Sequence, residues 1–298
     1  MPIVKVEKTL SSEERRRLID ELEKLGSGKL LEDLKRTLLK NLPPQLLNDK
    51  EFLSRYLLLA AVLDQQAESN SARGTVSMLY NEYGYQFFMD PKSYLDKIHE
   101  IVGKALKTYR PKVRVLRMKI TSITLSRIGG YMLAIHSLAL RYGGLLGYFR
   151  RFQNPKDLLE RGILGEIMFS SLLYEKAARL YVGWVTHPDL PVSVYGTSIP
   201  RNSIPMVVNG HVGKVMARTG FLEKVSVEDL ERKKIIEAEK VRSKIERLVK
   251  SVKPDGDFFA IDYGAFLVGI NYCHEEKPDC SRCILNTLCK KNIEIRAY

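Results

Sequence analysis

Four cysteines near the C-terminus constrain this chain more than any other feature of its sequence. They are the only cysteines in 298 residues and follow the spacing C-x6-C-x2-C-x5-C, as Cys273, Cys280, Cys283 and Cys289. Four thiolates suit a tetrahedral zinc ion, although zinc sites usually contain two short C-x(2–4)-C pairs and only one is present here. Four thiolates also bind a [4Fe–4S] cluster. A disulfide pair is disfavoured because nothing else in the chain suggests secretion. The spacing alone leaves zinc and iron–sulfur open.

The residues around these cysteines resemble a known loop. The segment Phe266 to Cys289, FLVGINYCHEEKPDCSRCILNTLC, is similar to the iron–sulfur loop of the endonuclease III family. These proteins are DNA base-excision glycosylases of the helix-hairpin-helix superfamily. The cysteine spacing matches without a gap, and Pro278 before the second cysteine also fits. The resemblance covers about the last tenth of the chain, and it implies a [4Fe–4S] cluster with an architectural role on all four cysteines.

Apolar periodicity predicts an all-α protein. The expected helices are 11–26, 29–39, 57–80, 94–108, 123–142, one that starts at 156–160, 167–185, 207–218 and 227–252. The first begins with Ser11 as a cap and glutamates in its first turn. The alternating charges of 223–253 predict a solvent-exposed helix.

The resemblance also implies how the helices are grouped, in a two-module helix-hairpin-helix glycosylase-like fold. Residues 51–204 would form the helical module with the hairpin. Residues 1–50 and 205–298 would form a discontinuous module that ends in the cluster loop, 273–289. The family's active-site cleft lies between the two modules.

A candidate nucleophile lies just after the expected hairpin. The segment Leu172 to Gly183, LLYEKAARLYVG, is similar to the family's second hairpin helix, with Lys176 at the position of the nucleophilic lysine. A neutral amine can displace the base, form a Schiff base with the sugar and permit β-elimination. The alternative interpretation of Lys176 is an ordinary surface lysine. The family's glycine-rich turn is missing, and Ser170 and Ser171 could bind phosphate through their hydroxyls instead.

A second departure concerns the family's catalytic carboxylate. The segment Val207 to Gly220, VVNGHVGKVMARTG, resembles a family helix that is headed by Asp, and Asn209 holds that position here. An amide takes no proton at neutral pH, but it can cap a helix and orient a water molecule. His211, in the first turn of this helix, would face solvent or the DNA backbone. Other carboxylates near these segments are Asp64, Glu68 and Asp189, each expected on the surface, and Asp262, expected to be structural.

Further positions match parts of the family that contact DNA. The stretch LLLAAVLDQQAE is similar to the helix whose terminal glutamine fills the space left by an extruded base, with Gln66 in that position and Gln65 beside it. Arg282, Lys290 and Lys291 surround the loop that contacts phosphates in the family. Eight basic residues without an acid between them could form a further phosphate-binding face, if they share one side of a helix: Lys104, Lys107, Arg110, Lys112, Arg114, Arg117, Lys119 and Arg127.

The overall charge agrees with a polyanionic partner. The chain contains 48 Lys and Arg against 35 Asp and Glu, a net charge of +13. It contains no run of 18 or more apolar residues and no secretory signal at its N-terminus. Charge and composition thus predict a polyanionic partner and no membrane partner. The resemblance implies that this partner is duplex DNA with a damaged base or an abasic site, and we expect a monomer in the cytoplasm, associated with the nucleoid, or in the nucleus.

Two functions from different classes are compatible with these residues. The first is a base-excision DNA glycosylase with β-lyase activity through Lys176, with Gln66 inserted into the base stack. The second is a non-catalytic nucleic-acid-binding iron–sulfur protein that has lost the catalytic carboxylate. Lys176, Gln66 and the complete cluster motif favour the first. Asn209 and the hairpin without glycine favour the second.

Overall fold

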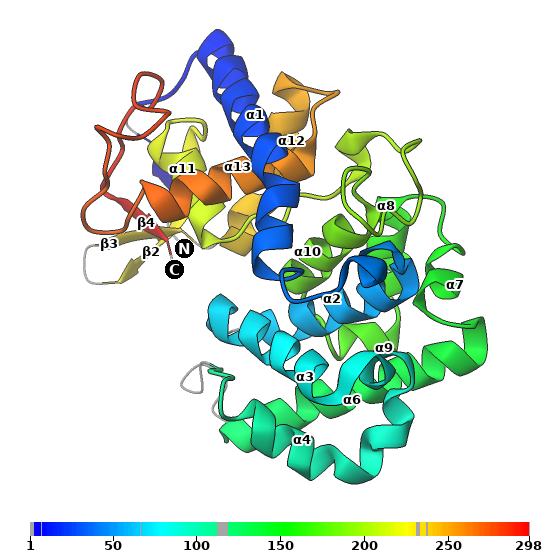
Figure 1. Cartoon of the computed structure of the whole chain (residues 1–298). Helices are drawn as coiled ribbons and strands as arrows, with labels where there is room; N and C mark the ends of the chain where they lie inside the picture. The colour runs from blue at the N-terminus through cyan, green and yellow to red at the C-terminus, as the bar shows by residue number, and fades with distance from the viewer. Residues whose placement is uncertain are drawn as a thin grey trace. The chain divides into compact units, whose positions relative to one another are not determined.

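The chain is mostly helical and divides into two compact units in the computed structural model (Figure 1). The structure describes residues 3–6, 8–65, 67–111, 119–230, 233–236 and 238–297. The middle unit comprises residues 33–199, and the terminal unit combines residues 1–32 with 200–298. Residues 33–50 thus belong to the middle unit, whereas the sequence grouped them with the termini. The first boundary falls inside helix α1 (Ser12–Thr37).

The terminal unit contains helices and the four strands of a small sheet, which are interspersed along the chain. Its elements are β1 (Ile3–Lys5), the first part of α1, the 3₁₀ helix η4 (Arg201–Ser203), α11 (Gly210–Arg218), β2 (Lys224–Leu230), β3 (Lys233–Ile236), α12 (Ala238–Val252), α13 (Phe258–Asn271) and β4 (Ile295–Ala297). Helix α1 begins as predicted, because Ser11 and Glu14 form a capping box: Ser11 N donates to Glu14 Oε2 at 2.8 Å and Glu14 N to Ser11 Oγ at 3.3 Å.

The helix predicted from Val227 onward is wrong in its first part. Residues 224–230 and 233–236 form two antiparallel strands, and the helix begins only at Ala238. The sheet has the order β1-β2-β3-β4, with β1 antiparallel to β2 and β3 parallel to β4. Both outer strands come from the ends of the chain. A charge pattern that is local in sequence does not report such long-range pairing.

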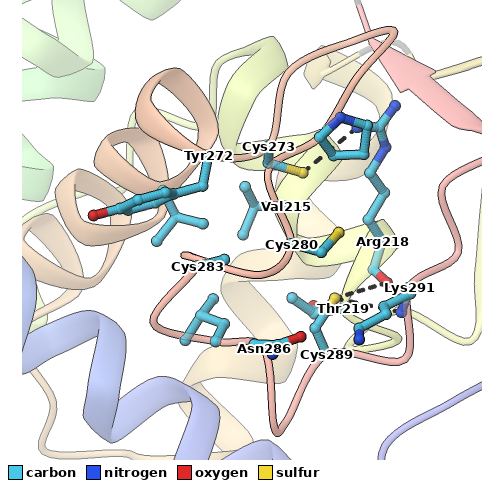
Figure 2. A pocket seen from close by; sticks show the side chains of 13 residues that line it. Val215, Arg218, Thr219, Tyr272, Cys273, Cys280, Cys283, Asn286, Cys289 and Lys291 are labelled. Carbon is cyan, nitrogen blue, oxygen red and sulfur yellow. Dashed lines mark hydrogen bonds between the residues drawn. The ribbon is translucent and has the colours of Figure 1, made fainter.

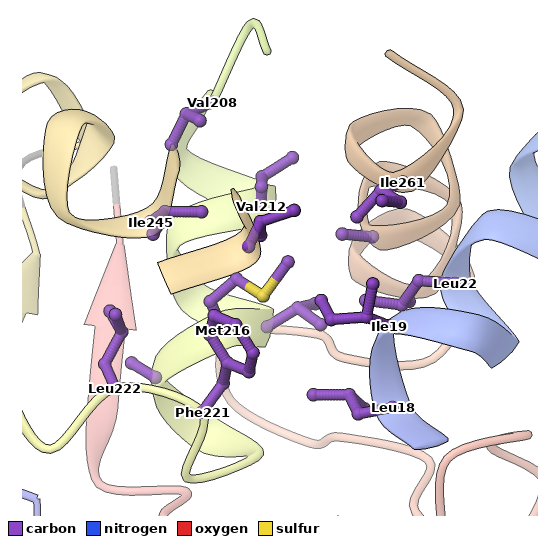
Figure 3. Close-up of a cluster of buried hydrophobic side chains, with 14 of the residues drawn as sticks. Leu18, Ile19, Leu22, Val208, Val212, Met216, Phe221, Leu222, Ile245 and Ile261 are labelled. Atoms are coloured by element: carbon purple, nitrogen blue, oxygen red, sulfur yellow. The ribbon is translucent and has the colours of Figure 1, made fainter. Parts of the chain in front are cut away.

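Helices α1, α11 and α13 enclose the core of the terminal unit (Figure 3). Leu18 and Leu22 of α1 pack with Val212 and Met216 of α11 and Ile261 of α13, all of them buried. Glycine permits α1 and α13 to approach closely. A Cβ atom on Gly26 would lie 1.8 Å from the carbonyl oxygen of Ala260. The sequence predicted two helices, 11–26 and 29–39, whereas α1 continues through both segments.

The middle unit is built around one buried helix. Its elements are the end of α1, η1 (Pro44–Asn48), α2 (Lys50–Asp64), α3 (Ser69–Met89), η2 (Pro91–Lys97), α4 (Ile98–Ala105), α6 (Ile120–Tyr142), α7 (Leu145–Phe149), α8 (Pro155–Asp157), the π-helix η3 (Leu158–Ile163), α9 (Ile167–Ser170) and α10 (Glu175–Thr186). Helix α2 packs against α3, α6, α7 and α10, and every residue from Phe52 to Leu63 is buried. A mostly apolar helix is expected at such a centre, and the buried cation of this stretch, Arg55, pairs with Glu51.

Helix α6 is long and apolar enough to cross a membrane by length and composition alone. Half of its most apolar window is buried inside the protein, with Ile128, Tyr131 and Ile135 in the core of the middle unit. The core helix of a globular protein passes the same test, so this helix is weak support for a membrane partner.

Candidate metal centre and nucleic-acid interface

All four cysteines line one cavity at the C-terminal end of α13 (Figure 2). Three of the thiols, those of Cys273, Cys283 and Cys289, also pack against the buried core of the terminal unit. Of the described residues that line the cavity, Arg218 and Lys291 are cationic and none is Asp, Glu or His. Within the described part of the chain, no three His, Cys, Asp or Glu residues have the spacing of ligands to a single metal ion.

Arg218 connects the start of the cysteine loop to the rest of the unit. Its side chain is 1% exposed, and its Nη1 donates to Cys273 Sγ at 3.6 Å and to the carbonyl of His274 at 2.7 Å. Its Nη2 donates to the carbonyl of Glu275 at 3.1 Å, and its Nε to that of Ile295 at 2.6 Å. One guanidinium therefore fixes both the loop and the last strand. This role was not predicted from the sequence.

A second buried cation on α11 holds the same loop. Lys214, one turn before Arg218, is 1% exposed, and its Nζ lies 2.6 Å from Glu275 Oε1. The sequence contained a signal for this role. Lys214 and Arg218 are spaced i, i+4 on the apolar side of α11, and buried cations at such positions need partners.

The end of the loop is bound through backbone groups. Lys291 N donates to Cys289 Sγ at 3.4 Å, and Cys289 Sγ donates to the carbonyl of Arg218 at 3.5 Å. Burial raises the pKa of Cys289 to about 11 and raises the pKa of Cys283 above its usual value. Metal ligation requires thiolates, so a bound cation would supply the charge that stabilises them here.

Asn209 caps helix α11, as an amide at that position can. Its Oδ1 accepts a hydrogen bond from Val212 N at 3.1 Å. The residue before it, Val208, has a φ of 46°, which is rare for a β-branched side chain. Asp262 holds that conformation, because its Oδ1 accepts from Val208 N at 2.7 Å. Asp262 is buried and structural, as expected, and it positions the residue before Asn209.

The expected hairpin lies between α9 and α10 and is supported by Gln65. This glutamine is 8% exposed; its Nε2 donates to the carbonyl of Leu172 at 2.6 Å, and its Oε1 accepts from Tyr174 N at 2.6 Å. The Gln65 side chain is thus occupied in holding the turn together. Gln66, its neighbour, lies outside the described residues.

The candidate residues on the hairpin are solvent-exposed. Lys176 is exposed on the first turn of α10, and it is followed by the buried Ala177 and Ala178. The hydroxyls of Ser170 and Ser171 donate to carbonyls of α9, those of Ile167 and Met168. Lys176 belongs to the middle unit and Asn209 to the terminal unit.

Several basic candidates already have partners. Arg282 pairs with Asp279, and Lys290 Nζ lies 2.6 Å from Glu14 Oε1. Lys291 is exposed. His211 is also exposed, with its ring 5.8 Å from that of Phe266.

The run of eight basic residues does not form one exposed face within the described residues. Lys104 pairs with Glu82 and Glu100, and Arg127 is buried. Lys107, Arg110 and Lys119 are exposed. Lys112, Arg114 and Arg117 lie outside the described residues.

The remaining candidate carboxylates have different environments. Glu68 and Asp189 are exposed. Asp64 is half-buried at the end of α2, and its Oδ1 is buried without a hydrogen-bond partner among the described residues. Of these carboxylates, only Asp64 thus departs from the expected surface role.

Comparison with known proteins adds no family: no family model matches the chain, and no curated protein matches its sequence. The resemblance to the endonuclease III family therefore stays a prediction that depends on the sequence motifs alone.

Proposed function

We propose that this protein is an iron–sulfur DNA glycosylase of the endonuclease III type, which releases a damaged base and cleaves the strand through Lys176. The main support for the proposal is that Cys273, Cys280, Cys283 and Cys289 line one cavity. A hairpin between two helices in the other unit, followed directly by Lys176, supports it.

The chemistry of the cavity supports a cluster. Four thiolates bound to a [4Fe–4S] core carry a net negative charge, and the described lining offers Arg218 and Lys291 with no carboxylate. When bound, the cluster would fix the loop that carries Arg282 and Lys291, since four cysteine ligands leave no iron position open for chemistry.

Lys176 would act as the nucleophile. Its exposed amine, once neutral, attacks the sugar carbon C1′, and the bond from C1′ to the base breaks, with the base leaving with the electron pair and taking up a proton. Opening of the sugar ring then gives an imine between Nζ and C1′. Loss of a proton from C2′ breaks the bond to the 3′ oxygen, which leaves with its phosphate. Extrusion of the target base from the duplex must precede these steps.

One observation favours a second function, a non-catalytic DNA-binding protein. The family's carboxylate is replaced by Asn209, and the Oδ1 of Asn209 is already bound to Val212 N. This amide neither accepts a proton nor carries the negative charge that would stabilise a sugar cation.

Covalent trapping distinguishes the two functions. Borohydride should reduce the imine between wild-type protein and duplex DNA with one abasic site, which gives a stable covalent band. Lys176→Ala should lose the band, and Lys156→Ala, a change at another exposed lysine, should keep it. Absence of the band with wild-type protein contradicts the lyase, and binding to DNA without base release would then support the second function.

A further inference from the structure

A polar groove in the middle unit lies between the end of α1 and one side of α3. Residues of the segment 36–41 form one wall, and Asn70, Arg73, Gly74 and Asn81 of α3 belong to the other. These α3 positions recur at intervals of three, four and seven residues, so they share one side of the helix. All of the described lining residues lie within 33–199, so the groove belongs to the middle unit alone.

The groove carries positive charge that is available to a ligand. Lys40 is exposed and Arg73 is half-buried, and within the described part of the chain neither has an ion-pair partner. A third cation of the lining, Arg36, pairs with Asp33 of its own helix at 2.7 Å. Glu82, the carboxylate among the described lining residues, pairs with a lysine of α4 at 2.8 Å. The charges of Lys40 and Arg73 are therefore not compensated within the groove, and they favour an anionic ligand.

The uncharged part of the lining is rich in amides. Asn41, Asn70 and Asn81 are exposed, and their side chains have no hydrogen-bond partner among the described residues. An asparagine side chain both donates and accepts, as the backbone of an extended peptide does along its length. The eleven residues from Asn70 to Asn81 span about 16 Å of helix. An extended peptide covers that distance with about five residues.

The shape and composition of the groove favour a peptide over a single strand of nucleic acid. None of the described lining residues is aromatic, whereas proteins bind single strands by stacking bases on aromatic rings. Gly74 leaves the middle of the α3 wall open, because a Cβ atom built there would meet no atom within 4 Å. The backbone of a ligand can thus approach the helix closely between Arg73 and Asn81.

We propose that this groove binds an extended acidic segment of a partner protein, about five residues long. Carboxylates of the segment would pair with Lys40 and Arg73, and its backbone would exchange hydrogen bonds with Asn70 and Asn81. The docking site is independent of the proposed glycosylase function, because it shares no residue with the cysteine cavity, the hairpin or Lys176.

The charge of the site is tested with a fluorescein-labelled octapeptide that alternates glutamate with alanine, by fluorescence anisotropy. The wild-type chain should bind it. The double variant Lys40→Gln, Arg73→Gln should bind about tenfold more weakly, since two charge-assisted pairs are lost. The matched control is Lys92→Gln, Arg150→Gln, which removes the same charge from two exposed positions of the same unit. It should change the affinity by less than about twofold, because distant exposed charges are screened by salt.

The shape of the site is tested with a change that leaves the charge constant. Gly74→Leu places a side chain in the groove and should weaken peptide binding about tenfold. Its melting temperature should stay the same or rise, because an exposed helical glycine is replaced. The control is Gly103→Leu in α4, also at an exposed position where a new Cβ would meet no atom within 4 Å, and it should keep full binding.

The outcomes separate the docking site from the alternatives. If the wild type does not bind the peptide, or if Gly74→Leu binds it as well as Gly103→Leu does, the groove is not a peptide site. Equal losses in the two charge variants would show that net charge alone attracts the peptide, which also overturns the site. If Gly74→Leu weakens binding of duplex DNA as much as binding of the peptide, the groove is a nucleic-acid surface and the peptide assignment is wrong. If the wild type binds no DNA at all, the proposed function fails while the peptide measurement still decides the docking site.

Discussion

The guanidinium of Arg218 donates a hydrogen bond to the sulfur of Cys273 at 3.6 Å. The same side chain binds the carbonyls of His274, Glu275 and Ile295. A residue of α11, the helix headed by Asn209, is thus in direct contact with the first cysteine of the loop. Any loss of this side chain should affect the loop and the stability of the terminal unit together.

Replacement of Arg218 tests that coupling. In Arg218→Leu the three carbonyls lose their donor, and each unsatisfied buried group costs about 1–3 kcal/mol. We expect a lower free energy of unfolding and less bound metal per chain. Arg282→Leu is the matched control, because Arg282 is exposed and pairs only with Asp279 within the described residues. Equal metal content in both variants would show that Arg218 does not hold the loop.

Two glycines of α1 should respond in opposite ways to alanine. Gly26→Ala places a Cβ 1.8 Å from Ala260 O, so the helices must separate, and we expect a loss of at least about 2 kcal/mol. Gly28 is exposed with no atom within 4 Å of a new Cβ, and Gly28→Ala should gain about 0.5–1 kcal/mol. Denaturant unfolding measures both. A stabilised Gly26→Ala would contradict the close crossing of α1 and α13.

Gln65 should be essential to the hairpin. In Gln65→Glu, an ionised carboxylate neither donates to the carbonyls of Val62 and Leu172 nor fits a buried position. We expect a loss of about 2 kcal/mol or more in the free energy of unfolding of the middle unit. Gln45→Glu, at an exposed position, should be nearly neutral. If the two changes have equal effects, Gln65 does not support the turn.

The pair between Glu14 and Lys290 should make stability depend on pH. The hydrogen bond from Lys290 lowers the pKa of Glu14 from 4.5 to about 2. Since the folded-state pKa is depressed, the stabilisation is complete above pH 4.5 and is lost as the pH falls toward 2. Glu14→Gln should remove this part of the pH dependence, and Glu13→Gln, at the exposed neighbouring position, should keep it. Unfolding curves between pH 2 and 5 measure the difference.

Features fixed by neighbours in sequence were predictable, and features fixed by distant partners were not. A serine cap followed by glutamates was predicted for the first helix, and Ser11 and Glu14 form a capping box there. Gln65 was predicted to lie beside Gln66 at a DNA-contacting position, whereas its side chain binds the carbonyl of Leu172, 107 residues away. The strands at 224–230 and 233–236 pair with the two ends of the chain, so the alternating charges there predicted a helix wrongly.

The candidate site shows the same division. The spacing of the cysteines predicted one shared location, and all four line one cavity. The structural roles of Arg218 and Lys214 were not predicted, because basic residues on a helix usually face solvent. Only the fold shows that both side chains are buried against the loop. The absence of glycine in the hairpin put an amide cradle in doubt, and the amides of Ser171, Leu172 and Leu173 donate to carbonyls of the same segment.

The iron and acid-labile sulfide content of protein purified without oxygen tests the cluster assignment most directly. We predict about four irons and four sulfides per chain, with a yellow-brown colour from thiolate-to-iron charge transfer. Cys280→Ser should lower both contents together, since one ligand is lost. A colourless protein that contains one zinc ion per chain and no sulfide would contradict the assignment.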